Sequence, residues 1–272
     1  AIQEIRGRFS GEADEQVRRA IAHTLGVLKD KDSLPLMAAA LRDSSTPPAV
    51  REAALEAVES IGTGDAVTVL LDVMKNGRLS DDRSRGLIAA LGRFKDAAAI
   101  KPLIDTLNGA SPAIKASIID AVASILTDKA NDEHGEAVAA IRSRIDDASA
   151  EVKKHAIQAL GKLGDRASIP ALIKANGAEE TRFESAMALA AMPDLTALPI
   201  YLRGLEDKST ELRGASSKAI SELRDLAAPV LDDLAKQNQL PASTVPLLRE
   251  IYQQVEPIRS WKTLWPFPLD AP

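Results

Sequence analysis

The sequence predicts an all-α protein, a right-handed α-α superhelix built from about seven tandem helix pairs. Three observations support this prediction. A similar segment recurs along the 272 residues at intervals of about 30 to 40 residues, which is typical of a solenoid. Apolar residues within each segment recur at helical spacing. The composition is 45% hydrophobic but only 3% aromatic, so the core should consist of small aliphatic side chains, which suit closely packed helices.

The repeat is clearest in two segments that match without a gap. Residues 17–28 read VRRAIAHTLGVL and residues 152–163 read VKKHAIQALGKL. The uninterrupted match indicates internal duplication. The same frame recurs with its first position at Val17, Val50, Arg83, Ile114, Val152, Thr181 and Leu212.

Each repeat should fold as two helices. In the first repeat, apolar residues at 17, 21, 25 and 28 outline one helix, and those at 34, 37, 38 and 41 outline the next. Aspartate occupies the turn between them, where it suits an N-cap or a turn; the examples are Asp30, Asp96, Asp165 and Asp194. Proline is tolerated in a first helical turn, and it opens second helices at Pro35, Pro102, Pro170 and Pro199.

The expected array covers residues 1–255. It comprises a partial repeat over 1–14, repeats starting near residues 15, 47, 81, 111, 149, 178 and 209, and a cap helix over 241–255. Residues 1–9 have the pattern of a second helix without its first, so we expect the chain to be a fragment of a longer protein. A polar insertion over 127–135 should form a loop. The proline-rich, aromatic residues 256–272 should form an extended tail.

Composition narrows the function classes. The net charge of −5, with acids and bases interspersed, argues against a dedicated nucleic-acid binder. The absence of cysteine excludes disulfides and thiol catalysis and fits either the cytoplasm or export. No apolar run approaches the roughly 20 residues of a membrane helix, so we expect no membrane insertion.

The pattern Val-Arg/Lys…Ala-Leu-Gly-x-Leu-Gly-Asp…Ile-Pro-Ala-Leu resembles the HEAT repeats of the phycobilisome-lyase-like type. It is clearest at residues 152–173 and 17–41, and the resemblance covers about residues 1–255. It implies a fold that many unrelated binding proteins share. The tail WKTLWPFP at 261–268 is similar to a junction in large planctomycete-type exported proteins with HEAT-like arrays, except that Trp265 stands where glycine is usual. This second resemblance favours export.

A catalytic site is not expected. Deoxyhypusine hydroxylase, a HEAT-like enzyme, uses paired His-Glu dipeptides as iron ligands, and none of His23, His134 and His155 precedes a glutamate. We expect helix-surface roles for His23 and His155, and no metal at His134 and its neighbouring carboxylates. Residues 62–65 lack the lysine of a phosphate loop. The sequence therefore predicts no catalytic residue, no cofactor and no metal site.

Three sets of residues are candidates for binding. Outward positions of the second helices, four of them basic, would suit an acidic partner: Lys101, Asp105, Arg142, Lys174 and Arg203. A basic ladder at one repeat position is either an anion rail or, the interpretation we favour, a set of ion pairs with acids such as Asp30, Asp96 and Asp165; it comprises Arg18, Arg51, Lys115, Lys153, Arg182 and Arg213. The candidate docking residues of the tail are Trp261, Trp265 and Phe267.

These observations predict a non-catalytic protein–protein interaction scaffold or spacer. Its partner would be another protein or a neighbouring domain of the same chain. One alternative is a phycobilin-lyase-like or chaperone-like subunit acting on a cofactor-bearing protein, which a deep apolar groove with convergent polar groups would support. Another is a connector whose tail docks on its own array or on the next domain.

Overall fold

The computed structural model describes residues 1–62, 64–77, 79–127 and 135–253. Every regular element in those ranges is helical, which confirms the predicted all-α solenoid. Contacts divide the chain into two units, residues 1–140 and 141–272. None of the described helices is both long and apolar enough to cross a membrane.

The helices alternate as first and second helices of successive pairs. The first helices are α2 (Glu15–Val27), α4 (Pro48–Ile61), α6 (Asp81–Phe94), α8 (Pro112–Thr127), α10 (Ala150–Leu163), α12 (Arg182–Ala191) and α14 (Thr210–Glu222). The second helices are α1 (Ile2–Gly11), α3 (Leu34–Arg42), α5 (Gly64–Asn76), α7 (Ile100–Leu107), α9 (Gly135–Arg142), α11 (Ile169–Ala175), α13 (Leu198–Gly204) and α15 (Arg224–Lys236), and α16 (Thr244–Gln253) ends the described chain.

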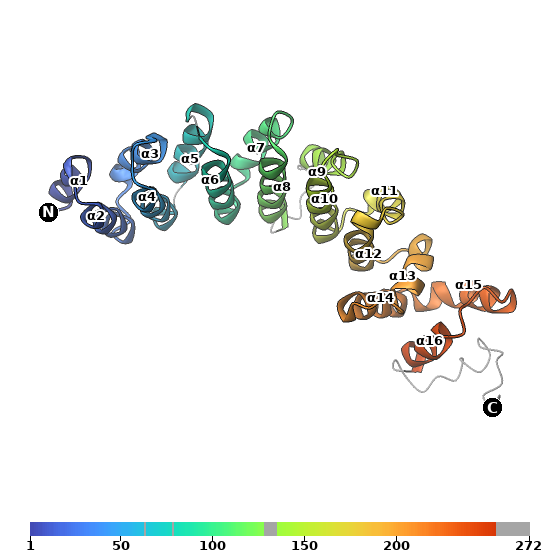
Figure 1. The fold of residues 1–272 in the computed structure, drawn as a ribbon. Coiled ribbons are helices and arrows are strands. Elements are labelled where there is room, and N and C mark those ends of the chain that lie inside the picture. Colours follow the sequence, from blue (N-terminus) through green and yellow to red (C-terminus); the bar gives the residue numbers. More distant parts are fainter. Residues whose placement is uncertain (63, 78, 128–134, 254–272) are drawn as a thin grey trace. The chain divides into compact units, whose positions relative to one another are not determined.

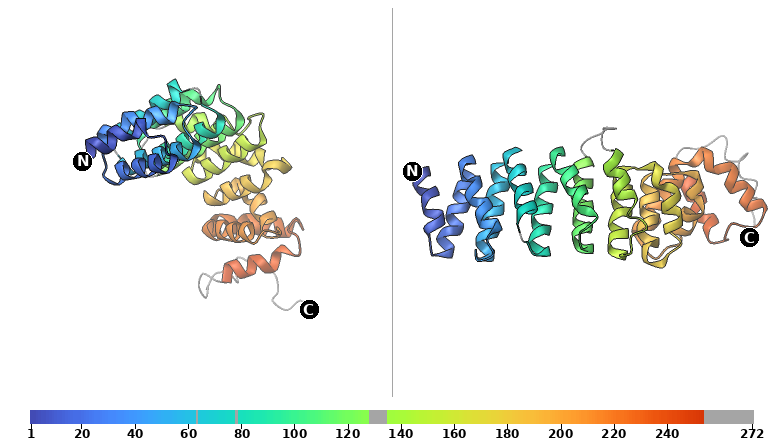
Figure 2. Two further views of the ribbon diagram at one scale, coloured as in Figure 1. Left: turned by 60° about the vertical axis from the view of Figure 1, so that its left-hand side comes forward. Right: turned by 90° about the horizontal axis from the view of Figure 1, so that it is seen from above.

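In the first unit, the first helices form one layer and the second helices the other (Figure 1). Helix α2 packs against α4, and α6 packs against α8. Each second helix also packs on the first helix that follows it, as α1 does on α2 and α3 on α4. Figure 2 shows the same succession of helices from above. A helix pair therefore buries its apolar face against its neighbours.

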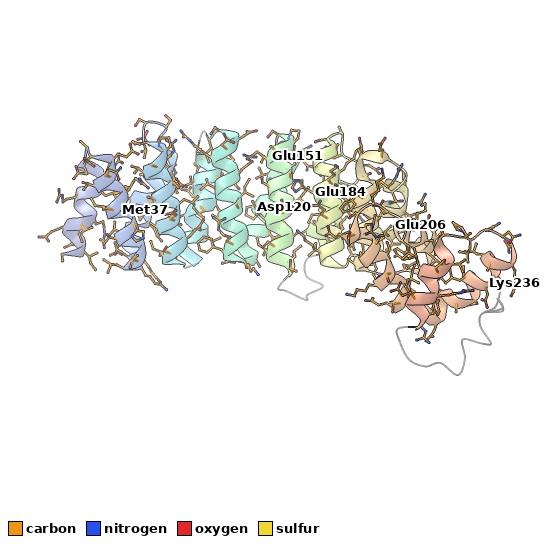
Figure 3. All side chains as sticks on the ribbon, turned by 60° about the horizontal axis from the view of Figure 1, so that its bottom comes forward. Met37, Asp120, Glu151, Glu184, Glu206 and Lys236 are labelled. Carbon is orange, nitrogen blue, oxygen red and sulfur yellow. The ribbon has the colours of Figure 1, made fainter. Side chains whose placement is uncertain are left out.

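The second unit repeats this arrangement. Helices α10, α12 and α14 pack in succession, while α11 and α13 lie against α12 and α14. Helix α14 also contacts both α15 and α16. The carboxylate of Glu206, labelled in Figure 3, accepts hydrogen bonds from the Ser243 and Thr244 hydroxyls at 2.5 and 2.7 Å. These bonds tie the start of α16 to the loop between α13 and α14.

Local sequence explains where the helices begin and end. Asp14 accepts a hydrogen bond from the Val17 amide at 3.0 Å, a side-chain N-cap. Asp96 and Asp194 cap the short 3₁₀ turns before α7 and α13, which confirms the predicted capping role at these two turns. Glycine Gly164 ends α10 with a φ of +65°, the left-handed conformation that glycine adopts without a steric penalty.

The core consists of aliphatic side chains between the two layers. Leu25, Met37 and Leu91 are fully buried, and Figure 3 marks Met37 among the helices of the first unit. Tyr201, also fully buried, keeps its hydroxyl satisfied by donating to the Leu189 carbonyl at 3.0 Å. A buried tyrosine needs such a partner because an unpaired hydroxyl away from water is costly.

Candidate functional site

An apolar groove runs between the N-terminal halves of the first helices α4 and α6. It has a volume of about 340 Å³. Its apolar lining consists of Leu41, Pro48, Leu55, Leu79 and Leu87, and the charged side chains around it are Arg51, Glu52, Asp82 and Arg83. An apolar hollow with a few polar groups at its edge is the usual form of a binding site.

The groove exists because α4 and α6 lack the close contact that other first helices make. A Cβ on Gly26 would lie 2.8 Å from the Cα of Ala57 where α2 crosses α4. A Cβ on Gly92 would lie 3.0 Å from the Cα of Ala121 where α6 crosses α8. Helices approach this closely only when one of the facing residues has no side chain.

The position of α4 that corresponds to Gly26 and Gly92 is Glu59. Its carboxylate bonds Arg93 of α6, with the Arg93 Nε donating to Oε2 at 3.3 Å. The long side chains of Glu59 and Arg93 therefore lie between α4 and α6 and keep the two helices apart. At the α2–α4 and α6–α8 crossings, glycine faces alanine instead. The groove widens further at Gly86, where a Cβ would meet only the Cδ2 atom of Leu55, at 3.8 Å.

Two arginines on neighbouring helices bring positive charge to the groove. The Arg51 guanidinium donates to the carbonyl of Thr46 and, at 3.5 Å, to that of Ser44. Burial lowers the pKa of Arg51 below its usual value, and the charge of the neighbouring Arg83 lowers it further. Arg83 is half-buried, and it makes no hydrogen bond or ion pair within the described residues. It is therefore the cation best placed to meet a ligand's carboxylate.

A second groove of the same construction lies in the second unit, between α14 and α16. Its volume is about 270 Å³. Arg213 occupies the ladder position that Arg51 occupies in α4, and it donates to the carbonyls of Asp207 and Lys208 at 2.7 and 3.0 Å. The other lining residues are Leu205, Thr210, Gly214, Ser217, Leu247, Glu250 and Ile251.

The predicted ion-pair role of the basic ladder is confirmed at Lys153, which pairs with Glu180 at the start of the next repeat at 2.7 Å, but it does not hold at every position. The expected pairing with Asp30 and Asp165 is wrong, because these carboxylates bond arginines of the second helices instead. Arg51 and Arg213 bond the carbonyls of the loops just before their own helices. A guanidinium supplies several donors in a fixed fork, so one arginine can bond two carbonyls of the same loop.

Asp30 and Asp165 form their ion pairs with Arg6 of α1 and Arg142 of α9. Arg142 donates from Nε and Nη2 to the two carboxylate oxygens of Asp165, at 2.8 and 2.7 Å. Arg6 forms the same bidentate pair with Asp30, at 3.0 and 2.7 Å. The hydrogen bond to Asp165 raises the pKa of Arg142. Such bidentate pairs are strong and directional, so each fixes a second helix to the turn of the next repeat.

The other candidates on the second helices lie at the surface. Lys101 and Asp105 are one turn apart on α7 and pair with each other at 3.3 Å. Lys174 of α11 is 76% exposed and pairs with Asp146 at 3.5 Å. Arg203 of α13 donates to the Asn176 side chain at 3.0 Å. The second unit thus carries Arg142, Lys174 and Arg203, and the first carries Lys101 and Asp105.

The remaining candidates divide between described and undescribed residues. His23 is exposed on α2, and His155 lies on α10. His134, most of the 127–135 insertion, and the tail candidates Trp261, Trp265 and Phe267 lie outside the described residues. Within the described part of the chain, no group of three or more His, Asp or Glu side chains has the geometry of a metal site.

Sequence reasoning missed the α4–α6 groove, although a signal for it is present. The ninth residue after the first position of the repeat is glycine at Gly26, Gly92 and Gly161 but glutamate at Glu59. The other three repeats have alanine or serine there, so a charged residue at a position that is otherwise small indicates that the helices cannot approach closely. At the α10–α12 crossing, where this position is Gly161, the helices do approach closely. A Cβ on Gly161 would lie 2.8 Å from the Ala188 Cα.

Comparison with known proteins gives one family match. The sequence profile of HEAT repeats matches residues 8–89 and 100–180. No curated protein sequence matches the chain.

Several solved structures are similar to the chain. The CpcE–CpcF complex of phycocyanin lyase from Nostoc is 18% identical, covers 82% of this chain and 87% of that one, and has a TM-score of 0.44. A designed armadillo repeat protein is 17% identical over 82% of this chain and 100% of its own, with a TM-score of 0.41. Human deoxyhypusine hydroxylase is 19% identical over 80% of this chain and 83% of its own, with a TM-score of 0.34.

Proposed function

The chain belongs to the HEAT-repeat family, and from that premise we propose that it is a non-catalytic scaffold that binds a protein segment in the α4–α6 groove. The groove supports this proposal because leucine side chains line it and Arg83 stands beside them without a partner in the described part of the chain. A segment that presents an apolar side chain next to a carboxylate satisfies both features. Burial of one such apolar side chain is worth about 1.5–3 kcal/mol.

Selection from a displayed library of random peptides tests the proposal. We expect enriched peptides to combine a leucine-like residue with an acidic one, and Gly86→Phe to abolish their binding by filling the groove. The variant should fold, because a Cβ at position 86 would make only an ordinary van der Waals contact with Leu55. Arg83→Glu should replace the acidic preference with a basic one.

Arg19→Glu is the matched control, since Arg19 lies on the first helix α2, is exposed and does not line the groove. Peptides that bind Gly86→Phe and Arg83→Glu as tightly as the unaltered chain would exclude this groove as the site. Circular dichroism and thermal unfolding of each variant separate loss of binding from loss of fold.

The charged second helices form a further part of this proposal. An acidic partner segment would contact Lys101 and Asp105 in the first unit, or Arg142, Lys174 and Arg203 in the second, and the exposure of Lys174 supports this role. Charge reversal at Arg142 would also break its pair with Asp165. Lys174→Glu is therefore the cleaner test: we expect weaker binding of a selected acidic peptide, and unchanged binding would remove this residue from the surface.

The same groove suits a second candidate, a lyase-like or chaperone-like subunit that acts on a cofactor-bearing protein. Arg51 and Arg83 beside an apolar hollow match the propionates and rings of a linear tetrapyrrole. Biliverdin is a direct probe: induced circular dichroism in its absorption bands that Gly86→Phe abolishes would favour this candidate. Peptide binding without any such signal favours the scaffold.

A further inference from the structure

Helix α15 exposes an apolar face that nothing in the described structure covers. Leu226 is 62% exposed and Val230 is 37% exposed. The two residues are one helical turn apart, so they lie on the same side of the helix, with the exposed Pro229 next to them. The opposite side of α15 is buried in the second unit through Ala227, Ala228, Leu231 and Ala235.

The described chain ends beside the first turn of α15. The Tyr252 hydroxyl, near the end of α16, donates to the Arg224 carbonyl at 3.0 Å. The Arg224 guanidinium lies 5.9 Å from the centre of the Tyr252 ring. Arg224 is the first residue of α15, and Leu226 follows it by two positions. The last described residues of α16 therefore lie close to the first turn of α15, which also carries Leu226.

Acidic groups line the edge of α15 that faces Tyr252. Burial raises the pKa of Tyr252 to about 12, and the carboxylates of Asp225 and Asp232 add to the rise. The Oδ1 atom of Asp232 is buried and has no hydrogen-bond partner in the described structure. The exposed carboxylate of Asp225 gives this edge negative charge, which favours a positively charged ligand.

The tail has the matching chemistry and enough length. Residues 254–272 contain Trp261 and Trp265, with the basic Arg259 and Lys262 close by. Trp261 follows Gln253 by 261 − 253 = 8 residues, which reach up to about 26 Å when extended. Helix α15, whose far end is marked by Lys236 in Figure 3, has 13 residues and is about 20 Å long. Both tryptophans can therefore reach the exposed face.

We propose that residues 256–268 of the tail dock on the Leu226–Val230 face of α15 in the same molecule. Trp261 and Trp265 cover the apolar face, and Arg259 and Lys262 lie against Asp225 and Asp232. This docking removes Leu226 and Val230 from solvent, and the inference stands apart from the proposed α4–α6 site.

Tryptophan fluorescence tests the proposal directly, because the only two tryptophans in the protein are Trp261 and Trp265. In the full chain we expect blue-shifted emission and protection from acrylamide quenching. Replacing both Leu226 and Val230 with lysine should move the emission to that of water-exposed indole and raise quenching several-fold. Both residues are solvent-exposed on α15, so the helix should remain folded, and far-UV circular dichroism checks this.

Val27→Lys is the matched control, since Val27 is an equally exposed apolar residue, 64% exposed, on α2 of the first unit. Its emission should equal that of the unaltered chain. Three results would overturn the proposal: solvent-exposed emission from the full chain, emission unaffected by the α15 substitutions, or a blue shift that disappears on dilution. The last would place the tail on a second copy of the chain.

Discussion

At the residue scale, glycine decides how closely the first helices approach. Gly161 allows the backbone of α10 to reach Ala188 of α12, since a Cβ there would lie 2.8 Å from the Ala188 Cα. Gly214 on α14 has no atom within 4 Å of such a Cβ. The two glycines share a residue type and a helical setting, yet only the first one is required by packing.

This difference gives a paired prediction. Gly161→Ala should destabilise the protein by about 1–2 kcal/mol, because overpacking against a neighbouring backbone outweighs the gain in helix propensity. Gly214→Ala should stabilise it by about 0.5–1 kcal/mol, since alanine is the better helix former. Urea unfolding of both variants measures the change in the free energy of unfolding, which should have opposite signs. A stabilising Gly161→Ala would show that the α10–α12 crossing has room to relax.

At the element scale, α16 depends on one carboxylate for its attachment to the second unit. Hydrogen bonds from Ser243 and Thr244 lower the pKa of Glu206 below its usual value of 4.5. A lowered folded-state pKa means that the carboxylate form is favoured by folding. Its stabilising contribution is therefore present above about pH 4.5 and is lost as the pH falls through the lowered folded-state value.

Hydrogen exchange of the α16 amides checks this pH dependence. We expect α16 to lose protection on acidification from neutral pH to below pH 4.5, because the bonds that attach it accept at the Glu206 carboxylate. Glu206→Gln should weaken α16 at neutral pH and remove most of the acid dependence. Glu222→Gln, on the exposed surface of α14, is the control. Equal acid sensitivity in Glu206→Gln would assign the effect to other groups.

At the scale of the whole molecule, stability should be local. In a stacked array each helix pair contacts mainly its neighbours, so the free energy of unfolding is a sum of nearest-neighbour terms. The described contacts follow this rule, because helices pack with those one or two places along the chain. A severe defect in one pair is therefore expected to spread only to adjacent pairs.

Leu160→Asp provides the test, since Leu160 is fully buried in α10. Burial of an unpaired carboxylate and loss of the leucine should cost about 3–5 kcal/mol. We expect hydrogen exchange to show loss of protection around α10 while α2 and α4 stay protected. Lys162→Ala, at an exposed position of the same helix, should change little. One cooperative loss of protection in every helix would contradict the nearest-neighbour description.

The sequence alone determined the helical repeat, the paired helices and the capping at Asp96 and Asp194, because these depend on local spacing and on side chains bonding nearby amides. It also placed Lys101, Lys174 and Arg203 on second helices. The partners of Asp30 and Asp165 were decided only by the tertiary structure, since Arg6 and Arg142 lie 24 and 23 residues away along the chain. The α4–α6 groove also required the structure: it depends on how closely two helices approach, which packing sets and a single sequence does not state.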